Sequence, residues 1–483
     1  MLQSLFHRAA RPAAVLATCG AAALAVTPAG PIALTAGSLP VPVPAISDYQ
    51  FLAASTTPPT ESACLAIGRR CFTAAAMESS YNLPSLYAAG NKGQGVTIAI
   101  IDSFGNPNMA SDLANFDTQM SLPHMCGEPG QACGTGVPTF QHLYWNGKTE
   151  VKSPPSGSHS PGLQDRTSWT LETSLDVEWA HAIAPLANII DLTTNPAETQ
   201  GVQGFPAMMD AEQWVVDNHQ ATVISQSFGA VEEGFASTQS MLNLRHAFVS
   251  AAASDVTVVA SSGDGGTANS TKTPVKNPST VPYPTVNWPA ADPLVTAVGG
   301  TYLCTDPATG TGVDSTDPPA RCQANPGTRE VGWIDSGGGF SHVFAKPAYQ
   351  DTLPGGSTPI GAMRGVPDVA FQASSLTGPL VYDTAPGAGG WFIVGGTSCS
   401  APEFAGLVAI AGQIAGHGLG QINSTLYQLA ASPAHASYFY DVTTGNNGAD
   451  PSIPGYPATT GWDPVTGLGT PNAAALVPAL AAG

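Results

Sequence analysis

The feature that most constrains the fold is a series of short apolar runs separated by segments with helical spacing. The first run, Val96–Ile101, is uninterrupted and rich in β-branched residues, which is typical of a parallel strand covered on both faces. Similar runs follow at Ile189–Leu192, Thr222–Ser225, Val256–Ser261 and Leu294–Val298. Helical patterns lie at Asp112–Met120, Trp169–Ala184, Ala207–Asp217 and Thr238–Ala253. This alternation predicts an α/β fold with a doubly wound, mostly parallel sheet flanked by helices.

The composition narrows the function. The chain has 483 residues, of which 10% are charged, and it contains 53 glycines and 43 prolines. Such a chain can bury a large core, and we expect it to be rich in long ordered loops, chiefly at 123–168 and 302–362. Its net charge of −19 argues against nucleic acid as a partner, because nucleic-acid binding requires a basic surface.

The N-terminus has the pattern of an export signal. His7, Arg8 and Arg11 precede the apolar run Ala13–Val26, which is too short and too rich in alanine to favour a membrane span. We therefore predict a signal peptide within residues 1–30 and a secreted protein, with a lipid-anchored form through Cys19 as the less favoured alternative. Residues 31–77 are rich in Pro, Ala and Thr and are interpreted as an extended leader or short pro-segment, and 78–483 as one large domain.

Eight cysteines fit an exported protein. Seven remain if Cys19 leaves with the signal. Six of these are near neighbours in sequence, which makes disulfides the simplest interpretation: Cys64 with Cys71, Cys126 with Cys133, and Cys304 with Cys322. The seventh, Cys399, follows Ser398 directly. It could be a nucleophile, but we favour a small buried residue lining a turn.

Residues 395–402 form the pattern Gly-Gly-Thr-Ser-x-Ser-x-Pro, between the apolar run Trp391–Val394 and a helical segment. We expect the helix to start near Pro402, since proline fits the first turn of a helix. Ser398 would then lie at the positive end of a helix dipole, where a developing anion is stabilised. The competing interpretation is that Ser398 and Ser400 only cap the helix.

A nucleophilic serine needs a base. No histidine lies in a context typical of a Ser-His-Asp triad, and His181 is better interpreted as a packed or surface residue in the middle of a helix. Glu172 and Asp176, by contrast, are four residues apart on a predicted helix, so both carboxyl groups project from one largely apolar face. In a desolvated site such a pair shares a proton and can act as a base in acid. In water it would be an ordinary solvated acidic face.

Asp264 follows the predicted strand Val256–Ser261 in a glycine-rich turn. The carboxyl end of a parallel strand is where α/β proteins place their sites. A protonated Asp264 could donate a hydrogen bond to an oxyanion, or it could simply stabilise the turn.

Together these motifs resemble the sedolisin family of serine-carboxyl peptidases from about Tyr81 to the C-terminus. Two further stretches are also similar to the family: Gly337–Ser341 with Pro347 and Gln350, and Arg364–Val369. The resemblance implies a subtilisin-like fold and an endopeptidase acting at acid pH through an acyl-enzyme on Ser398. It assigns Glu172 and Asp176 as the general base pair and Asp264 as the oxyanion donor.

The resemblance also implies one Ca²⁺ ion near the C-terminus. The ligands it assigns are the side chains of Asp441 and Asp463 and the carbonyls of Val442, Thr459 and Gly461. We expect protein or peptide substrates, no membrane span, and a monomer. The alternatives are a catalytically silent sedolisin-like domain that binds peptides, and a neutral protease that uses a histidine.

Overall fold

The computed structural model describes residues 43–44, 48–152, 163–194, 204–271 and 280–483. Their centre is a nine-stranded sheet with the order β12-β11-β9-β7-β3-β6-β4-β5, and β15 pairs with β11 beside this path. The strands are β3 (Thr97–Ser103), β4 (Phe140–Trp145), β5 (Glu150–Val151), β6 (Asn188–Thr194), β7 (Val223–Gln226), β9 (Thr257–Ser261), β11 (Thr296–Leu303), β12 (Glu330–Gly332) and β15 (Val369–Gln372). All pairings are parallel except those of β5 and β12. The predicted fold class is confirmed.

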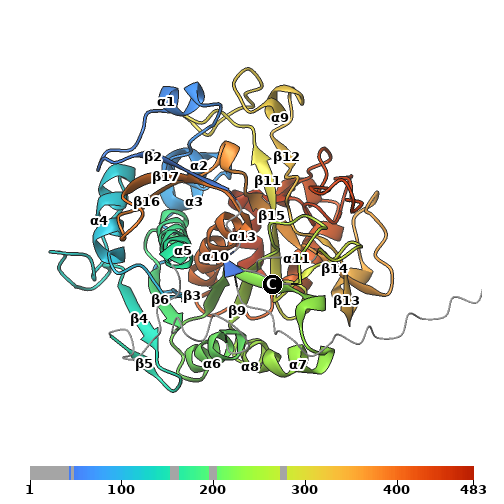
Figure 1. The fold of residues 1–483 in the computed structure, drawn as a ribbon, viewed down its shortest axis with the longest axis horizontal. Helices are drawn as coiled ribbons and strands as arrows, with labels where there is room; N and C mark the ends of the chain where they lie inside the picture. The colour runs from blue at the N-terminus through green and yellow to red at the C-terminus, as the bar shows by residue number, and fades with distance from the viewer. Residues whose placement is uncertain (1–42, 45–47, 153–162, 195–203, 272–279) are drawn as a thin grey trace, which may run out of the picture. The chain divides into compact units, whose positions relative to one another are not determined.

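Helices cover both faces of this sheet (Figure 1). Along β3, Ile98 and Ile100 enter one core cluster with α5, α10 and α13, whereas Ala99 and Ile101 enter a second cluster with α6 and α8. The helices are α1 (Glu61–Ala66), α2 (Ala74–Ser80), α3 (Pro84–Ala88), α4 (Met109–Met120), α5 (Leu163–Ile183), α6 (Gly204–Asp217), α7 (Thr238–Leu242), α8 (His246–Ala253), α9 (Ala320–Gln323), α10 (Thr397–Ala415), α11 (Asn423–Ala431), α12 (His435–Tyr438) and α13 (Ala473–Ala482). Apolar side chains on alternate faces of β3 thus explain the two helical layers.

The remaining strands form small separate sheets. They are β1 (Val43–Pro44), β2 (Tyr49–Ala53), β8 (Phe228–Val231), β10 (Asn287–Trp288), β13 (Gly339–Ala345), β14 (Met363–Val366), β16 (Leu380–Asp383), β17 (Gly390–Val394), β18 (Phe439–Tyr440) and β19 (Thr470–Pro471). Two predicted loop regions are therefore partly wrong, because 123–168 contains β4 and β5, and 302–362 contains β12 and β13. In β4 the polar Gln141 and His142 interrupt the apolar residues, so the sequence shows no continuous run there.

The predicted helix Thr238–Ala253 is divided into α7, a 3-10 turn at Asn243–Arg245, and α8. The other three predicted helices and all five predicted strands are present with small shifts at their ends. A helical pattern in the sequence fixes the apolar face but does not exclude a local tightening of the backbone.

The predicted leader is not wholly extended. In its described part, β1 pairs with β8 and β2 pairs with β17, and α1 and α2 follow. Cys64, Phe72 and Met77 are buried in the same core cluster as α5 and α10, which explains why this segment folds onto the domain. The predicted signal peptide, residues 1–30, lies outside the described residues. Among the helices in the described ranges, none combines the length and apolarity that crossing a membrane requires.

The three predicted disulfides are confirmed: Cys64–Cys71, Cys126–Cys133 and Cys304–Cys322. Cys399 is a free, buried cysteine, and its Sγ lies 3.7 Å from the carbonyl oxygen of Val394. Burial raises the pKa of the Cys399 thiol well above its ordinary value, with the charge of Glu403 acting in the same direction. Because only the thiolate is strongly nucleophilic, this environment favours a packing role for Cys399.

Candidate active site

Ser398 lies in the first turn of α10, directly after strand β17 and a pair of glycines. Gly396 has φ +123°, a backbone conformation that residues with side chains rarely adopt, and a Cβ on Gly395 would collide with the backbone of Ser375. The Gly396 N–H donates a hydrogen bond of 2.6 Å to the carbonyl of Ala373, just beyond β15. The glycine pair therefore lets the chain turn sharply from strand to helix and places Ser398 at the positive end of α10.

The predicted helix start near Pro402 is wrong, because α10 begins at Thr397 and Pro402 lies inside it. Proline has no N–H, so the carbonyl four residues earlier, that of Ser398, receives no helical hydrogen bond from it. All residues from Thr397 to Gly412 are buried. Packing along most of α10 thus stabilises a helix that proline would otherwise interrupt.

Glu172 and Asp176 lie one turn apart on α5, and both side chains are fully buried. Burial excludes the alternative of a solvated acidic face. Helices α5 and α10 come close together because Gly406 of α10 lacks a side chain: a Cβ there would lie 2.8 Å from the Ile183 side chain. Asp176 accepts a hydrogen bond of 3.0 Å from the Ser227 hydroxyl. The pair is therefore held in a dry site between two helices.

Electrostatics connect the four predicted catalytic residues. Burial raises the pKa of Glu172 well above its ordinary value, and the charges of Asp176, Asp102 and Asp264 raise it further, while the nearby Ser398 hydroxyl lowers it. The Ser398 hydroxyl and the Glu172 carboxyl influence each other at close range, but no hydrogen bond of good geometry joins them. The structure thus brings Glu172, Asp176, Asp264 and Ser398 together.

Two more buried carboxyl groups, Asp102 and Asp191, lie on the adjacent strands β3 and β6. Burial raises the pKa of Asp102 to about 7. The pKa of Asp191 is raised well above its ordinary value, first by burial and then by the charge of Asp102. The pKa of Asp176 is likewise raised by burial, and the charges of Asp102 and Asp191 raise it further. Asp191 is not among the predicted site residues, although a carboxylate inside the apolar run Ile189–Leu192 is a usable signal.

These raised pKa values predict that the protein is more stable in acid than at neutral pH. Burial raises the pKa of both Asp102 and Glu232 to about 7, whereas the unfolded chain releases these protons near pH 4. Each group therefore lowers the free energy of unfolding as the pH rises from about pH 4 to about pH 7, by on the order of 1 kcal/mol per pH unit. Urea unfolding of a Ser398→Ala variant, which avoids self-digestion, measures this slope. A free energy of unfolding that rises over that range would contradict the prediction.

Asp264 joins the turn after β9 to the start of α10. Its Oδ1 accepts hydrogen bonds from the Thr397 backbone N–H at 2.8 Å and from the Thr397 hydroxyl at 2.9 Å. The Thr397 hydroxyl oxygen in turn accepts from the Gly263 N–H at 2.9 Å. This reciprocal contact fixes Asp264 next to the residue that precedes Ser398.

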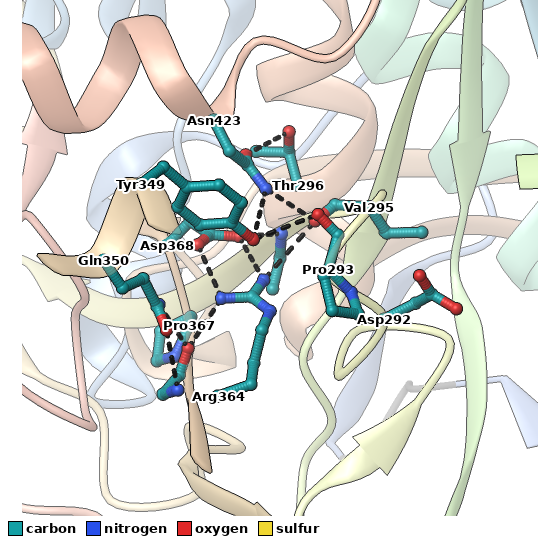
Figure 2. Close-up of polar contacts among 12 residues, drawn as sticks. Asp292, Pro293, Val295, Thr296, Tyr349, Gln350, Arg364, Pro367, Asp368 and Asn423 are labelled. Carbon is teal, nitrogen blue, oxygen red and sulfur yellow. Dashed lines mark hydrogen bonds and ion pairs between the residues drawn. The ribbon is translucent and has the colours of Figure 1, made fainter. Parts of the chain in front are cut away.

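The stretch Arg364–Val369 contains a buried ion pair within a polar network (Figure 2). Arg364 donates to both carboxylate oxygens of Asp368, at 2.9 and 2.7 Å, and one of these oxygens also accepts from the Ala297 N–H of β11. Gln350 adds hydrogen bonds to the backbone of the residue after Arg364. The network lies at the start of β15 and therefore positions this strand. Ala373, whose carbonyl accepts from the Gly396 N–H, directly follows β15.

The leader also reaches this region. Strand β2 pairs with β17, the strand that leads to Ser398. The carbonyl oxygen of Asp48 accepts a hydrogen bond of 2.8 Å from the Gly395 N–H. The Asp48 carboxylate contacts Arg69 and Ser375. No local pattern in the sequence predicts these contacts, because their partners lie far apart along the chain.

The predicted calcium ligands lie in two adjoining loops. Both carboxylate oxygens of Asp441 accept from the Gly461 N–H at 3.1 Å, and Asp463 accepts from the Thr459 N–H at 2.9 Å. Val442 and Asp463 are fully buried. Within the described residues, neither carboxylate forms an ion pair with a lysine or arginine. Two carboxylates on adjoining loops, one of them buried without a lysine or arginine partner among the described residues, are a donor set that fits a hard divalent ion.

Comparison with known proteins agrees with this geometry. The model of the subtilase family matches residues 173–419, just over half of the chain. Kumamolisin from Bacillus sp. (strain MN-32) is 32% identical over 85% of this chain and 63% of its own length, and sedolisin from Pseudomonas sp. (strain 101) is 30% identical over 68% of this chain and 52% of its own length. A tripeptidyl-peptidase of Arthroderma otae is 33% identical over 62% of this chain and 45% of its own length.

A solved structure of Pseudomonas sedolisin, a serine-carboxyl proteinase in complex with two molecules of pseudo-iodotyrostatin, matches with a TM-score of 0.64. The identity is 25%, over 85% of this chain and 97% of that one. The chain thus has a subtilase fold and belongs to the subtilase family. Within these subtilisin-like proteins it is a member of the sedolisin family. It spans between 45% and 63% of the length of the three curated relatives named above.

Proposed function

We propose that this chain is a secreted serine-carboxyl peptidase that hydrolyses peptide bonds in proteins at acid pH. The observation that carries the proposal is the meeting, in one dry site, of Ser398 at a helix start with the buried pair Glu172 and Asp176. A serine in this position has a base within close range and a helix dipole that stabilises negative charge. The kinship to sedolisin and kumamolisin supports the same conclusion.

In the proposed first step, the Ser398 Oγ attacks the carbonyl carbon of the scissile bond while Glu172 accepts the hydroxyl proton. Asp176 holds the partner proton of the pair, so the second carboxyl is not charged beside the first. The new Oγ–C bond forms as the carbonyl π electrons move onto the oxygen. The tetrahedral intermediate then collapses, Glu172 returns the proton to the leaving amine, and the acyl-enzyme remains.

The developing oxyanion needs a donor, and the proposal assigns this role to Asp264. Its Oδ1 already accepts two hydrogen bonds from Thr397, so a proton on this carboxyl would reside on Oδ2. A neutral carboxylic acid can donate such a hydrogen bond when its site is dry or the medium is acid. Water then attacks the acyl-enzyme with Glu172 again acting as base, which releases the acid product and restores Ser398.

Whether internal bonds or N-terminal tripeptides are cleaved can be tested on the products. We propose endopeptidase action. The wild-type protein is incubated at pH 4 with an acid-denatured protein substrate, and the peptides are identified by mass spectrometry at early times. Internal cleavages at scattered positions are expected, and they must be absent with Ser398→Ala. Exclusive release of tripeptides would instead assign tripeptidyl-peptidase action, and no cleavage by the wild type would favour the catalytically silent domain.

We also propose that one Ca²⁺ ion binds at Asp441 and Asp463, with the carbonyls of Val442, Thr459 and Gly461. The ion would neutralise two carboxylates and join the two loops that carry them. Such a site is structural: it does not take part in the steps above. The proposal further includes a monomeric protein acting outside the cell.

Removal of calcium is expected to lower the melting temperature. A ligand that binds only the folded state adds about 2.7 kcal/mol at ~100 times its Kd. Differential scanning calorimetry of Ser398→Ala at neutral pH, with calcium and then with a chelator, measures the change. The double variant Asp441→Asn/Asp463→Asn should show no response. The control Asp450→Asn changes a carboxylate that accepts from Ser452 of its own turn, and it should respond like the parent. An equal response in both variants would place the ion elsewhere.

A further inference from the structure

A second group of polar side chains lies away from the candidate active site, where α4 ends. Asp117 is on the last turns of α4, and His124 and Glu128 follow in the loop after it. Each offers one ligating atom, and these atoms all lie within 4.8 Å of one another. The disulfide Cys126–Cys133 closes the loop that contains Glu128. A covalent constraint thus holds one of the three side chains in place.

The carboxyl groups of Asp117 and Glu128 are buried, and that of Asp117 lacks hydrogen bonds of good geometry among the described residues. Asp117 is fully buried, and among the described residues neither of its oxygens accepts a hydrogen bond of good geometry. Its nearest cationic partner is His181 of α5, whose Nε2 lies 3.3 Å from the Asp117 carboxylate. The Glu128 side chain is also buried, and it contacts His124 Nδ1 at 2.5 Å and the Met125 N–H. Two buried carboxyl groups this close together need either a compensating positive charge or a shared proton.

We propose that Asp117, His124 and Glu128 bind one divalent transition-metal ion of the Zn²⁺ class. One imidazole nitrogen with two carboxylate oxygens is a donor set for such ions, whereas Ca²⁺ and Mg²⁺ prefer oxygen alone. Metal–ligand distances of about 2.0–2.2 Å require ligand atoms roughly 3.3–3.6 Å apart in a tetrahedral site. The three ligand atoms lie within 4.8 Å of one another, so small side-chain movements would bring them to these distances.

The surroundings supply an entry path and an outer partner. The His124 side chain is 32% exposed, so an ion can reach the group from solvent. His181 is fully buried, and besides Asp117 it contacts the Pro123 carbonyl oxygen at 3.0 Å through Nε2. A histidine that contacts a ligating carboxylate in this way orients it, as outer partners of metal sites commonly do. The fourth position is left for water.

The site would have a structural consequence for the active-site helix. His181 is on α5, five residues beyond Asp176. A metal bound by Asp117, His124 and Glu128 would connect the end of α4 and the disulfide loop to this helix through His181. The ion would thus stabilise the segment that carries the carboxylate pair without touching the substrate.

The competing interpretation is a network that shares protons and binds no metal. In that case shared protons and the neighbouring imidazoles of His124 and His181 would compensate the two carboxyl groups without an ion. The two interpretations differ in whether Zn²⁺ binds with defined stoichiometry, and in whether binding depends on His124. Neither depends on the proposed peptidase activity, so failure of one does not affect the other.

The test uses the full chain with Ser398→Ala, stripped of transition metals, at pH 7 with excess calcium present to fill calcium sites. Equilibrium dialysis against Zn²⁺ with metal analysis gives the stoichiometry, and thermal unfolding gives the stabilisation. One equivalent of Zn²⁺ and a raised melting temperature are expected. Adding His124→Ala or Glu128→Gln should weaken the binding on the order of 100-fold. His124 is partly exposed, so its variant should fold even if Glu128→Gln does not.

The matched control is His246→Ala, which removes another partly exposed histidine that is paired with an acidic residue, Asp210. It should bind Zn²⁺ like the parent. The proposal is overturned if the parent binds no Zn²⁺, or if His124→Ala binds Zn²⁺ as tightly as His246→Ala. With Co²⁺ in place of Zn²⁺, visible absorption that disappears in His124→Ala would show the nitrogen ligand directly.

Discussion

Ser398→Ala is expected to lose peptidase activity on the order of 10⁴–10⁶-fold in kcat, with little change in stability. The hydroxyl is buried and makes no hydrogen bond of good geometry among the described residues, so its removal leaves no partner unsatisfied. Glu172→Gln should lose at least about 10⁴-fold, because the amide keeps the shape of the side chain but cannot accept the serine proton. Initial rates on a fluorogenic peptide, divided by the folded fraction, measure both losses.

The matched control is Glu212→Gln. Glu212 is also fully buried, and burial also raises its pKa. It lies on α6, on the other face of the sheet from α5, and it accepts a hydrogen bond from Gln226. Its variant should retain activity near that of the wild type, which separates loss of a base from loss of any buried carboxyl group. Equal losses in the Glu172 and Glu212 variants would remove Glu172 from the chemistry.

The same variants test the pH dependence. Burial and neighbouring charge raise the pKa of Glu172 and Asp176 well above ordinary values, so the pair keeps a shared proton where isolated carboxyls have lost theirs. As the pH rises, loss of that proton would place two charges in one dry site, and activity should fall. We therefore expect an optimum below about pH 6. An optimum near pH 8 that survives Glu172→Gln would contradict the carboxylate mechanism and favour a histidine base.

The features that the sequence predicts are those with local physical causes. The helix spacing places Glu172 and Asp176 on one face, and the Gly395–Gly396 pair before a helix indicates a sharp turn from strand to helix at Ser398. The parallel sheet follows from apolar runs such as Val96–Ile101, whose residues enter both core clusters. Each of these inferences needs only a window of a few residues.

The features that the sequence does not predict depend on distant contacts. The pairing of β2 with β17 joins the predicted leader to the strand before Ser398, and no local pattern in Tyr49–Ala53 indicates that partner. The group of Asp117, His124 and Glu128 has no spacing typical of a metal site and comes together only through a loop closed by a disulfide. Asp191 is a different case, because its position inside an apolar run could have been noticed. A helical start at Thr397 was hidden by Pro402, whose usual position is the first turn.

Asp264→Asn is expected to keep measurable activity, whereas Asp264→Ala should lose roughly 10²–10³-fold in kcat with little effect on KM. The asparagine oxygen can still accept from the Thr397 N–H and hydroxyl, and its amide can donate to the oxyanion. Alanine loses both contacts. The measurement is kcat and KM for the three proteins from about pH 3 to about pH 8, with the folded fraction determined by circular dichroism in each buffer.

The pH profiles decide between the functional and the structural role of Asp264. If a protonated carboxyl donates to the oxyanion, the wild type loses this donor as Asp264 ionises, and Asp264→Asn, which does not titrate, should lose less activity toward neutral pH. If Asp264 only holds the start of α10 through Thr397, both variants should be less stable. The activity of the molecules that remain folded should then have the same pH dependence as the wild type. Identical profiles for all three proteins after this correction would exclude Asp264 as the oxyanion donor. In that case the helix start at Ser398 would have to stabilise the oxyanion through backbone N–H groups alone.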